Sequence, residues 1–272
     1  MSRTGDLRAP RTSIAHADLR AQIAAGAQGQ HPLLAFADPD FLADPSLRGI
    51  RAQIELMKPE ITQQRLGIKH HVVVFGSARS EPGSWAYDQA RDLGAKVARW
   101  SKSAESDEHL YVATGGGGGI MEAANRGSHD EGWPSLGFLV TLPFESQVNE
   151  FVTPELGFRF HYFAMRKAHL VLRAAALVTF PGGYGTLDEA FEVLTLVNTR
   201  KLNPMPVLFV GEEFWRRLID WDYLVDTGMV SPEALEILQI VPDAAAAWRV
   251  ISDFYGLGVA AVDEYGGQQW GR

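Results

Sequence analysis

The sequence predicts an α/β protein, a doubly wound, Rossmann-like parallel sheet with an N-terminal helical extension. Two observations support this fold class. From residue 70 onward, short, continuously apolar runs alternate with helical segments, a pattern typical of parallel strands covered on both faces. Three of those runs end in glycine-rich turns, and ligands of such sheets bind outside the carboxyl ends of the strands. The same observations therefore predict both the fold and the position of a site.

Residues 1–66 are predicted to form the helical extension. Breaks that contain proline separate two candidate helices, Ser13 to Ala25 and Pro45 to Leu66. Asp44 suits the N-cap of the second helix because Pro45 follows at its first position, and Pro59 is a candidate kink. An apolar stripe on this helix consists of Leu47, Ile50, Ile54, Met57 and Ile61. This stripe must pack on the main domain or on a second subunit.

Residues 67–255 are predicted to form the Rossmann-like nucleotide-binding domain. The apolar runs predict strands at Val72 to Phe75, Leu110 to Ala113, Leu136 to Thr141, Ala175 to Phe180 and Val207 to Val210. The segments between and after them predict helices at Trp85 to Trp100, Ile120 to His129, Phe163 to Leu172, Leu187 to Asn198 and Phe214 to Val225. Residues 232–255 are expected to add helical material, and residues 256–272 to form a loosely ordered tail.

The composition excludes several classes of function. The formal net charge of −8 gives no general attraction to a nucleic-acid backbone. The absence of cysteine excludes disulfides, thiolate metal sites and a cysteine nucleophile. The sequence shows neither a signal-peptide core nor an apolar run long enough to span a membrane, so we expect a soluble, cytoplasmic protein. We also expect no metal, since clustered ligands are lacking.

The first two glycine turns are candidate ligand contacts. Gly76 and Ser77 follow the first strand, where backbone amides and a hydroxyl group can meet a ligand, and Arg79 lies beside them. The run Gly115 to Gly119 permits positive φ and close approach of a ligand, so Gly116, Gly117 and Gly118 are candidates. The alternatives are a turn that only permits tight packing and a flexible linker. The run lies between an apolar strand and an amphipathic helix, which favours a ligand turn.

The third turn combines an anion site with a carboxylate. The segment Pro181 to Thr186 links an apolar strand to a helix, and the N-terminus of a helix attracts a phosphate. Glu189 follows one turn later, where its charge would weaken a simple phosphate site, so we interpret it as a chemical group. Arg166, near the start of an earlier helix, is placed to bind a phosphate or sugar hydroxyls. Lys167 is interpreted only as its neighbour on a solvated face.

Together these residues resemble the Lonely Guy (LOG) family of phosphoribohydrolases, which release the base from nucleoside 5'-monophosphates and are often labelled lysine decarboxylases. The resemblance covers residues 70–225. It implies that Arg166 and Glu189 are catalytic and that the glycine run and Met165 contact the nucleoside. It also implies a homodimer, and it assigns the 5'-phosphate to Gly182, Gly183, Gly185 and Thr186. We expect a homodimer or a higher homo-oligomer and no cofactor.

This chemistry suits the residue types. Cleavage of a ribosyl C1'–N bond develops positive charge on the sugar, which a carboxylate at Glu189 stabilises, or that carboxylate activates the attacking water. Arg166 is expected to keep Glu189 ionised by its opposite charge. We expect the substrate to be AMP or a cytokinin riboside monophosphate. The alternative function is a non-catalytic nucleotide-binding or carrier protein; a pyridoxal-phosphate lysine decarboxylase is rejected, because Lys167 lies in no recognisable cofactor site.

Overall fold

The structure is a computed structural model that describes residues 12–29, 32–104, 108–140 and 148–257. The predicted tail lies, from residue 258 onward, outside the described residues, and so does Thr141 of the third predicted strand. The chain divides into two compact units, Met1–Ile54 and Glu55–Arg272.

The first unit is helical. It contains α1 (Thr12–Ala27), α2 (Pro39–Ala43) and the first part of α3 (Arg48–Arg65), with short 3-10 turns at Ala35–Ala37 and Pro45–Leu47. Asp44 acts as a cap, as predicted, since its side chain accepts a hydrogen bond from Ser46 N. It caps the 3-10 turn, however, and the α-helix begins only at Arg48. Pro59 lies inside α3, which continues to Arg65.

The second unit is built on one parallel sheet of seven strands in the order β4-β3-β2-β1-β5-β6-β7. The strands are β1 (His70–Phe75), β2 (Leu110–Thr114), β3 (Ser135–Val140), β4 (Gly157–Phe160), β5 (Ala174–Thr179), β6 (Val207–Val210) and β7 (Leu238–Val241). The order of the strands reverses between β1 and β5, the point at which ligands of doubly wound sheets bind. The sheet confirms the predicted fold class.

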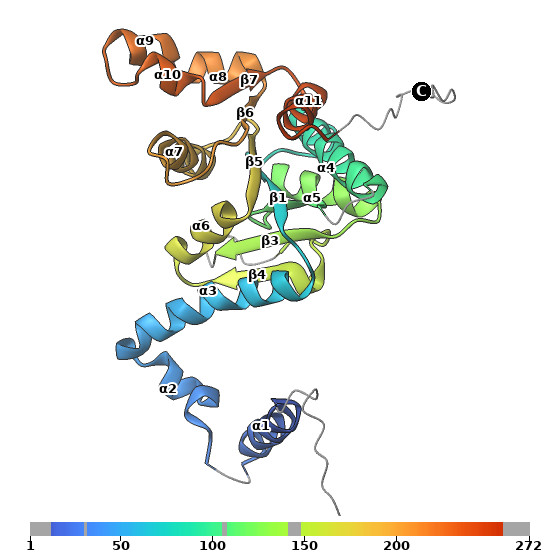
Figure 1. Cartoon of the computed structure of the whole chain (residues 1–272), viewed down its shortest axis with the longest axis vertical. Helices are drawn as coiled ribbons and strands as arrows, with labels where there is room; N and C mark the ends of the chain where they lie inside the picture. Colours follow the sequence, from blue (N-terminus) through green and yellow to red (C-terminus); the bar gives the residue numbers. More distant parts are fainter. Residues whose placement is uncertain (1–11, 30–31, 105–107, 141–147, 258–272) are drawn as a thin grey trace, which may run out of the picture. The chain divides into compact units, whose positions relative to one another are not determined.

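Helices cover both faces of this sheet (Figure 1). One face packs against α4 (Trp85–Ser103), α5 (Ile120–Asp130) and α11 (Ala244–Tyr255). The other face packs against α6 (Phe163–Leu172) and α7 (Tyr184–Asn198). The central strands are buried on both sides, which explains why their sequences are continuously apolar. No helix among the described residues is long and apolar enough to cross a membrane.

Three sequence predictions need correction. The strands β4 and β7 were not predicted, because these edge strands contain exposed positions and lack the continuous apolar run of a central strand. The region 232–255, expected to be helical, therefore contains β7 between α10 (Pro232–Leu235) and α11. The single helix predicted at 214–225 is two helices, α8 (Glu212–Leu218) and α9 (Trp221–Asp226). Asp220 starts the second helix by accepting a hydrogen bond from Tyr223 N.

The apolar stripe of α3 has two residues in the second unit, and both are exposed there. Met57 and Ile61, which lie in the second unit, are 48% and 38% exposed. Contact of the stripe with a second subunit stays a prediction.

Candidate active site

The first and third glycine turns meet where the strand order reverses. Phe180 N donates to Phe75 O over 2.8 Å, and Ser77 N donates to Pro181 O over 2.9 Å. A methyl group on Gly182 would lie 3.0 Å from the carbonyl carbon of Gly76 and 2.2 Å from Thr186 Oγ1. The two turns therefore touch through their backbones, and only glycine fits at residue 182.

The second glycine turn joins the first. Ile120 N donates to Ser77 O over 3.1 Å. Gly119 has a φ of 63°, and a methyl group there would lie 2.3 Å from Ser77 O. Gly118 is half-buried, and a methyl group placed on it would lie 3.6 Å from Ala78 O. The contacts confirm that the three turns converge on one edge of the sheet.

Gly116 and Gly117 have a different environment, because both are buried. Asn149 donates from its backbone to Gly116 O and from its side-chain Nδ2 to Gly117 O, in each case over 2.9 Å. The same Nδ2 lies 3.1 Å from Asn125 Oδ1, which accepts a hydrogen bond from Thr114. This buried network fixes the shape of the glycine run. Asn149 was missed by the sequence analysis because a lone asparagine in an irregular stretch carries no signal.

The third turn opens α7 at Tyr184, three residues before the predicted start of the helix. Gly183 is the N-cap residue, and its carbonyl accepts hydrogen bonds from Thr186 N and Leu187 N, each over 3.0 Å. The N–H groups of Tyr184 and Gly185 open the helix, where no intrahelical acceptor precedes them. Among the described residues, no atom lies within 4 Å of a methyl group placed on Gly183 or Gly185. An anion can therefore approach the backbone of this helix N-terminus at Gly183 and Gly185.

Arg166 and Glu189 form an ion pair that joins α6 to α7. The guanidinium Nη2 donates to Glu189 Oε1, and the two side chains are only 11% and 4% exposed. The Arg166 Cζ atom lies 6.0 Å from the centroid of the Phe75 ring, so the pair lies close to the end of β1. Met165 is partly buried in the same cluster of apolar side chains as Phe75. The structure thus brings the predicted catalytic residues together beside the first turn.

The pKa of Glu189 differs from the expectation that Arg166 would keep it ionised. Burial raises the pKa of this carboxyl above its usual value, although the charges of Arg166 and Lys167 act in the opposite direction. The ion pair forms as expected, but the cost of removing a carboxylate from water is larger than the gain from its partners. Glu189 therefore binds a proton more readily than an ordinary glutamate.

Lys167 is not on a solvated face, in contrast to the interpretation of the sequence. Its side chain is 16% exposed, and Nζ lies 2.7 Å from Glu192 Oε2, 2.9 Å from Asp188 Oδ2 and 3.8 Å from Glu189 Oε2. Burial opposes its charge, yet the hydrogen bonds to Glu192 and Asp188 leave the pKa of Lys167 raised. Lys167 is thus a second cation beside the carboxylate of Glu189.

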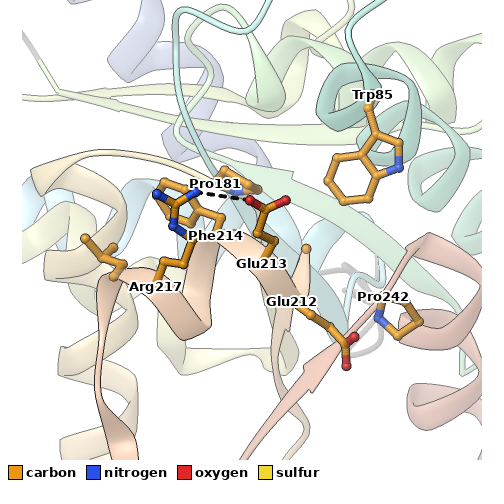
Figure 2. A pocket seen from close by; sticks show the side chains of 9 residues that line it. Trp85, Pro181, Glu212, Glu213, Phe214, Arg217 and Pro242 are labelled. Atoms are coloured by element: carbon orange, nitrogen blue, oxygen red, sulfur yellow. Dashed lines mark hydrogen bonds and ion pairs between the residues drawn. The ribbon is translucent and has the colours of Figure 1, made fainter.

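A cavity of about 730 Å³ adjoins the third turn at Pro181 (Figure 2). The indole of Trp85 forms one wall and packs against Gly211, whose φ is 97°. Glu213 pairs with Arg217 over 3.1 Å at the opposite side. Neither Arg166 nor Glu189 is among the residues that line this cavity. In the part of the chain that the structure describes, no group of three histidine or carboxylate side chains is arranged to hold a metal ion.

Comparison with known proteins decides the family. The family described as "Possible lysine decarboxylase" matches residues 121–251. Cytokinin riboside 5'-monophosphate phosphoribohydrolase LOG2 of Arabidopsis thaliana is 30% identical over 188 residues, which cover 67% of this chain and 83% of the relative. The chain belongs to the LOG family. Among other LOG proteins, LOG3 of Arabidopsis thaliana is 25% identical over 196 residues, covering 71% of this chain and 86% of the relative.

A solved structure shares the fold of this LOG protein. The X-ray structure of TM1055, a structural genomics target, has a TM-score of 0.50 at 23% identity, covering 68% of this chain and 99% of that one. This likeness supports the Rossmann-like architecture.

Proposed function

We propose that this LOG protein hydrolyses the N-glycosidic bond of a nucleoside 5'-monophosphate to a free base and ribose 5-phosphate. The observation that carries the proposal is the buried Arg166–Glu189 pair beside three converging glycine turns. The curated relatives LOG2 and LOG3 are named as phosphoribohydrolases of cytokinin riboside 5'-monophosphate. For this chain we propose AMP or a cytokinin riboside monophosphate as the substrate.

The 5'-phosphate is assigned to the start of α7. The first N–H groups of the helix have no intrahelical acceptor, an added Cβ at Gly183 or Gly185 would lie in open space, and the helix dipole favours an anion there. Gly182 permits the third glycine turn to approach the first glycine turn closely, and the side chain of Thr186 packs against Gly182. Ser77, Gly118 and Met165 are assigned to the nucleoside, whereas the buried Gly116 and Gly117 act through the shape of their turn.

The reaction then takes place beside Glu189. Water adds to C1' as the C1'–N bond breaks, and the base leaves with a proton. A carboxylate stabilises the positive charge on the ribose ring or accepts a proton from the water. The raised pKa of Glu189 suits proton transfer, since a group transfers protons most effectively when its pKa is near the pH at which the enzyme works. Arg166 has a buried Nε with no hydrogen-bond partner among the described residues, so the pair with Glu189 does not use all the donors of the guanidinium.

The buried ion pair also argues against a carrier protein. Binding of a nucleotide requires the turns but not Glu189, and a buried ion pair is expensive compared with apolar side chains. A negative charge beside the phosphate site would further weaken simple binding. We therefore favour the hydrolase, whose reaction uses both residues.

The test is incubation of the purified protein with AMP, isopentenyladenosine monophosphate, the other ribonucleoside monophosphates, adenosine and lysine. Chromatography should show free base and ribose 5-phosphate from one or more monophosphates, with no base from adenosine and no cadaverine from lysine. Monophosphates that remain intact at high protein concentration would contradict the hydrolase and leave the carrier alternative.

We also propose that the protein is a homodimer. The half-exposed apolar side chains Met57 and Ile61 on α3 support an interface between subunits. Light scattering coupled to gel filtration should give twice the chain mass of 29.9 kDa, and a monomer at micromolar concentration would contradict this.

A further inference from the structure

A carboxylate from α3 binds the start of the helix that carries Arg166. Glu55 Oε1 accepts a hydrogen bond from His161 N over 2.8 Å, and Glu55 Oε2 accepts one from Tyr162 N over 3.1 Å. Tyr162 is the N-cap residue of α6, and its own side chain makes no capping hydrogen bond. The first turn of α6 also contains no acidic residue. Glu55 therefore supplies from another helix the negative charge that a helix N-terminus favours.

The residue held by Glu55 is linked directly to Arg166. The carbonyl of Tyr162 accepts hydrogen bonds from Met165 N over 3.1 Å and from Arg166 N over 3.3 Å. The Arg166 Cζ atom also lies 5.7 Å from the centroid of the Phe163 ring, in the same turn of the helix. A displacement of this turn moves both the backbone of Arg166 and the ring against which its guanidinium packs.

Glu60 makes a separate link between α3 and the other end of α6. Its carboxylate accepts hydrogen bonds from Arg173, the C-cap residue of α6, with Arg173 Nη2 to Glu60 Oε2 at 2.8 Å. The two glutamates thus hold opposite ends of one helix. Of these two glutamates, Glu55 is the one hydrogen-bonded to the turn that precedes Arg166.

We propose that Glu55 is a positioning residue, whose carboxylate holds the first turn of α6 so that the guanidinium of Arg166 stays paired with Glu189. Its effect on turnover rests on the proposed function, but its effect on the ion pair does not. The second half of α3 then belongs to the active-site machinery, although it is distant from the site in sequence.

The test compares Glu55→Gln with Glu60→Gln as a matched control on the same helix. The first readout is the pKa of Glu189, measured by carbon-13 NMR of labelled glutamate and assigned by the signal lost in Glu189→Gln. The charged groups that face this carboxyl are Arg166, Lys167 and Glu192, and Asp188 faces Lys167. Since Arg166 lowers the pKa of Glu189, its displacement in Glu55→Gln should raise that pKa further, by about half a unit or more.

Glu60→Gln should leave the pKa of Glu189 unchanged, even where it lowers the thermal stability as much as Glu55→Gln does. Arg166→Gln serves as the reference for complete loss of the pair. A pKa of Glu189 that does not move in Glu55→Gln, or that moves equally in Glu60→Gln, overturns the proposal. Glu55→Asp, which keeps the charge on a shorter side chain, should give an intermediate shift and provides the measurement where Glu55→Gln is too unstable.

The second readout is kinetic. In Glu55→Gln, kcat should fall about tenfold with a smaller change in KM, because the phosphate turn on α7 is untouched. An unchanged kcat also overturns the proposal. If the wild-type protein releases no base, the proposed function is contradicted but the positioning role of Glu55 is not, because the titration of Glu189 requires no turnover.

Discussion

The guanidinium of Arg166 donates a hydrogen bond to the carboxylate of Glu189, and neither side chain is more than 11% exposed. The pair connects α6 with α7 where β1 and β5 end. It therefore places a carboxyl group of raised pKa beside the turn that is proposed to hold a phosphate.

Glu189→Gln should abolish base release but leave the affinity for AMP within about tenfold of the wild-type value, because the phosphate turn is untouched. The two measurements are chromatography of the products and calorimetric titration with AMP. Glu192→Gln, three residues further along α7, removes a partner of Lys167 but not of Arg166, so it should retain base release. Loss of AMP binding in Glu189→Gln would instead indicate a structural role.

The pH dependence of kcat/KM should contain an acidic limb that belongs to Glu189. A carboxylate that stabilises the ribosyl cation or accepts a proton must be ionised, so the rate should rise as the pH passes through its pKa. Burial raises that pKa, which places the midpoint of the limb above the ordinary value of 4.5. A midpoint at or below 4.5 would show that burial does not dominate at this site. The measurement is the initial rate of base release at low substrate concentration.

Lys167→Gln should move this limb to still higher pH. The charge of Lys167 lowers the pKa of Glu189, so its removal favours the protonated carboxyl. The variant should also unfold at a lower temperature, since three carboxylates of α7 lose a shared cation: Asp188, Glu189 and Glu192. Lys201→Gln is the matched control on an exposed lysine and should change neither the midpoint of the acidic limb nor the unfolding temperature. An unchanged acidic limb in Lys167→Gln would exclude Lys167 from the electrostatics of the site.

Gly182→Ala and Gly183→Ala should separate folding from ligand binding. The methyl group of Gly182→Ala meets Thr186 Oγ1 and the backbone of Gly76, so the variant should lose about 1–3 kcal/mol of stability. The methyl group of Gly183→Ala meets no described atom and should leave the melting temperature unchanged. It enters the space assigned to the phosphate and should weaken AMP binding by about tenfold or more. Wild-type affinity in Gly183→Ala would place the phosphate elsewhere.

The protein should lose stability on mild acidification because of His71. Burial lowers the pKa of this fully buried imidazole from 6.5 to about 4. The unfolded chain therefore binds a proton at a higher pH than the folded one, and the free energy of unfolding should fall by about 2 kcal/mol between pH 7 and pH 5. His71→Gln should reduce this slope in urea unfolding, whereas His70→Gln, at an exposed neighbouring position, should not. Equal slopes in all three proteins would contradict the prediction.

The central strands and the glycine turns could be predicted from the sequence because their signals are local. Burial on both faces requires apolar runs such as Val72 to Phe75, and close backbone contact requires glycine at residue 182. Other features depend on contacts between distant residues. Glu55 binds Tyr162 across 107 positions of sequence, and Lys167 meets its carboxylates only after α6 packs beside α7. The raised pKa of Glu189 depends on how deeply this packing buries it, which no local pattern encodes.

The strand order also determines when the site can form during folding. Gly76 and Gly182 meet only after β1 has paired with β5, and β2, β3 and β4 lie between these two strands in sequence. Such non-local pairing is slow to form, because a long loop must close first. A chain that is still emerging from the ribosome can pair β1 with β2 but lacks the turn proposed to hold the phosphate until α7 has been synthesised. The proposed nucleotide site is therefore completed late in the maturation of this protein, and AMP, as the proposed ligand, should stabilise only chains whose sheet already includes β5.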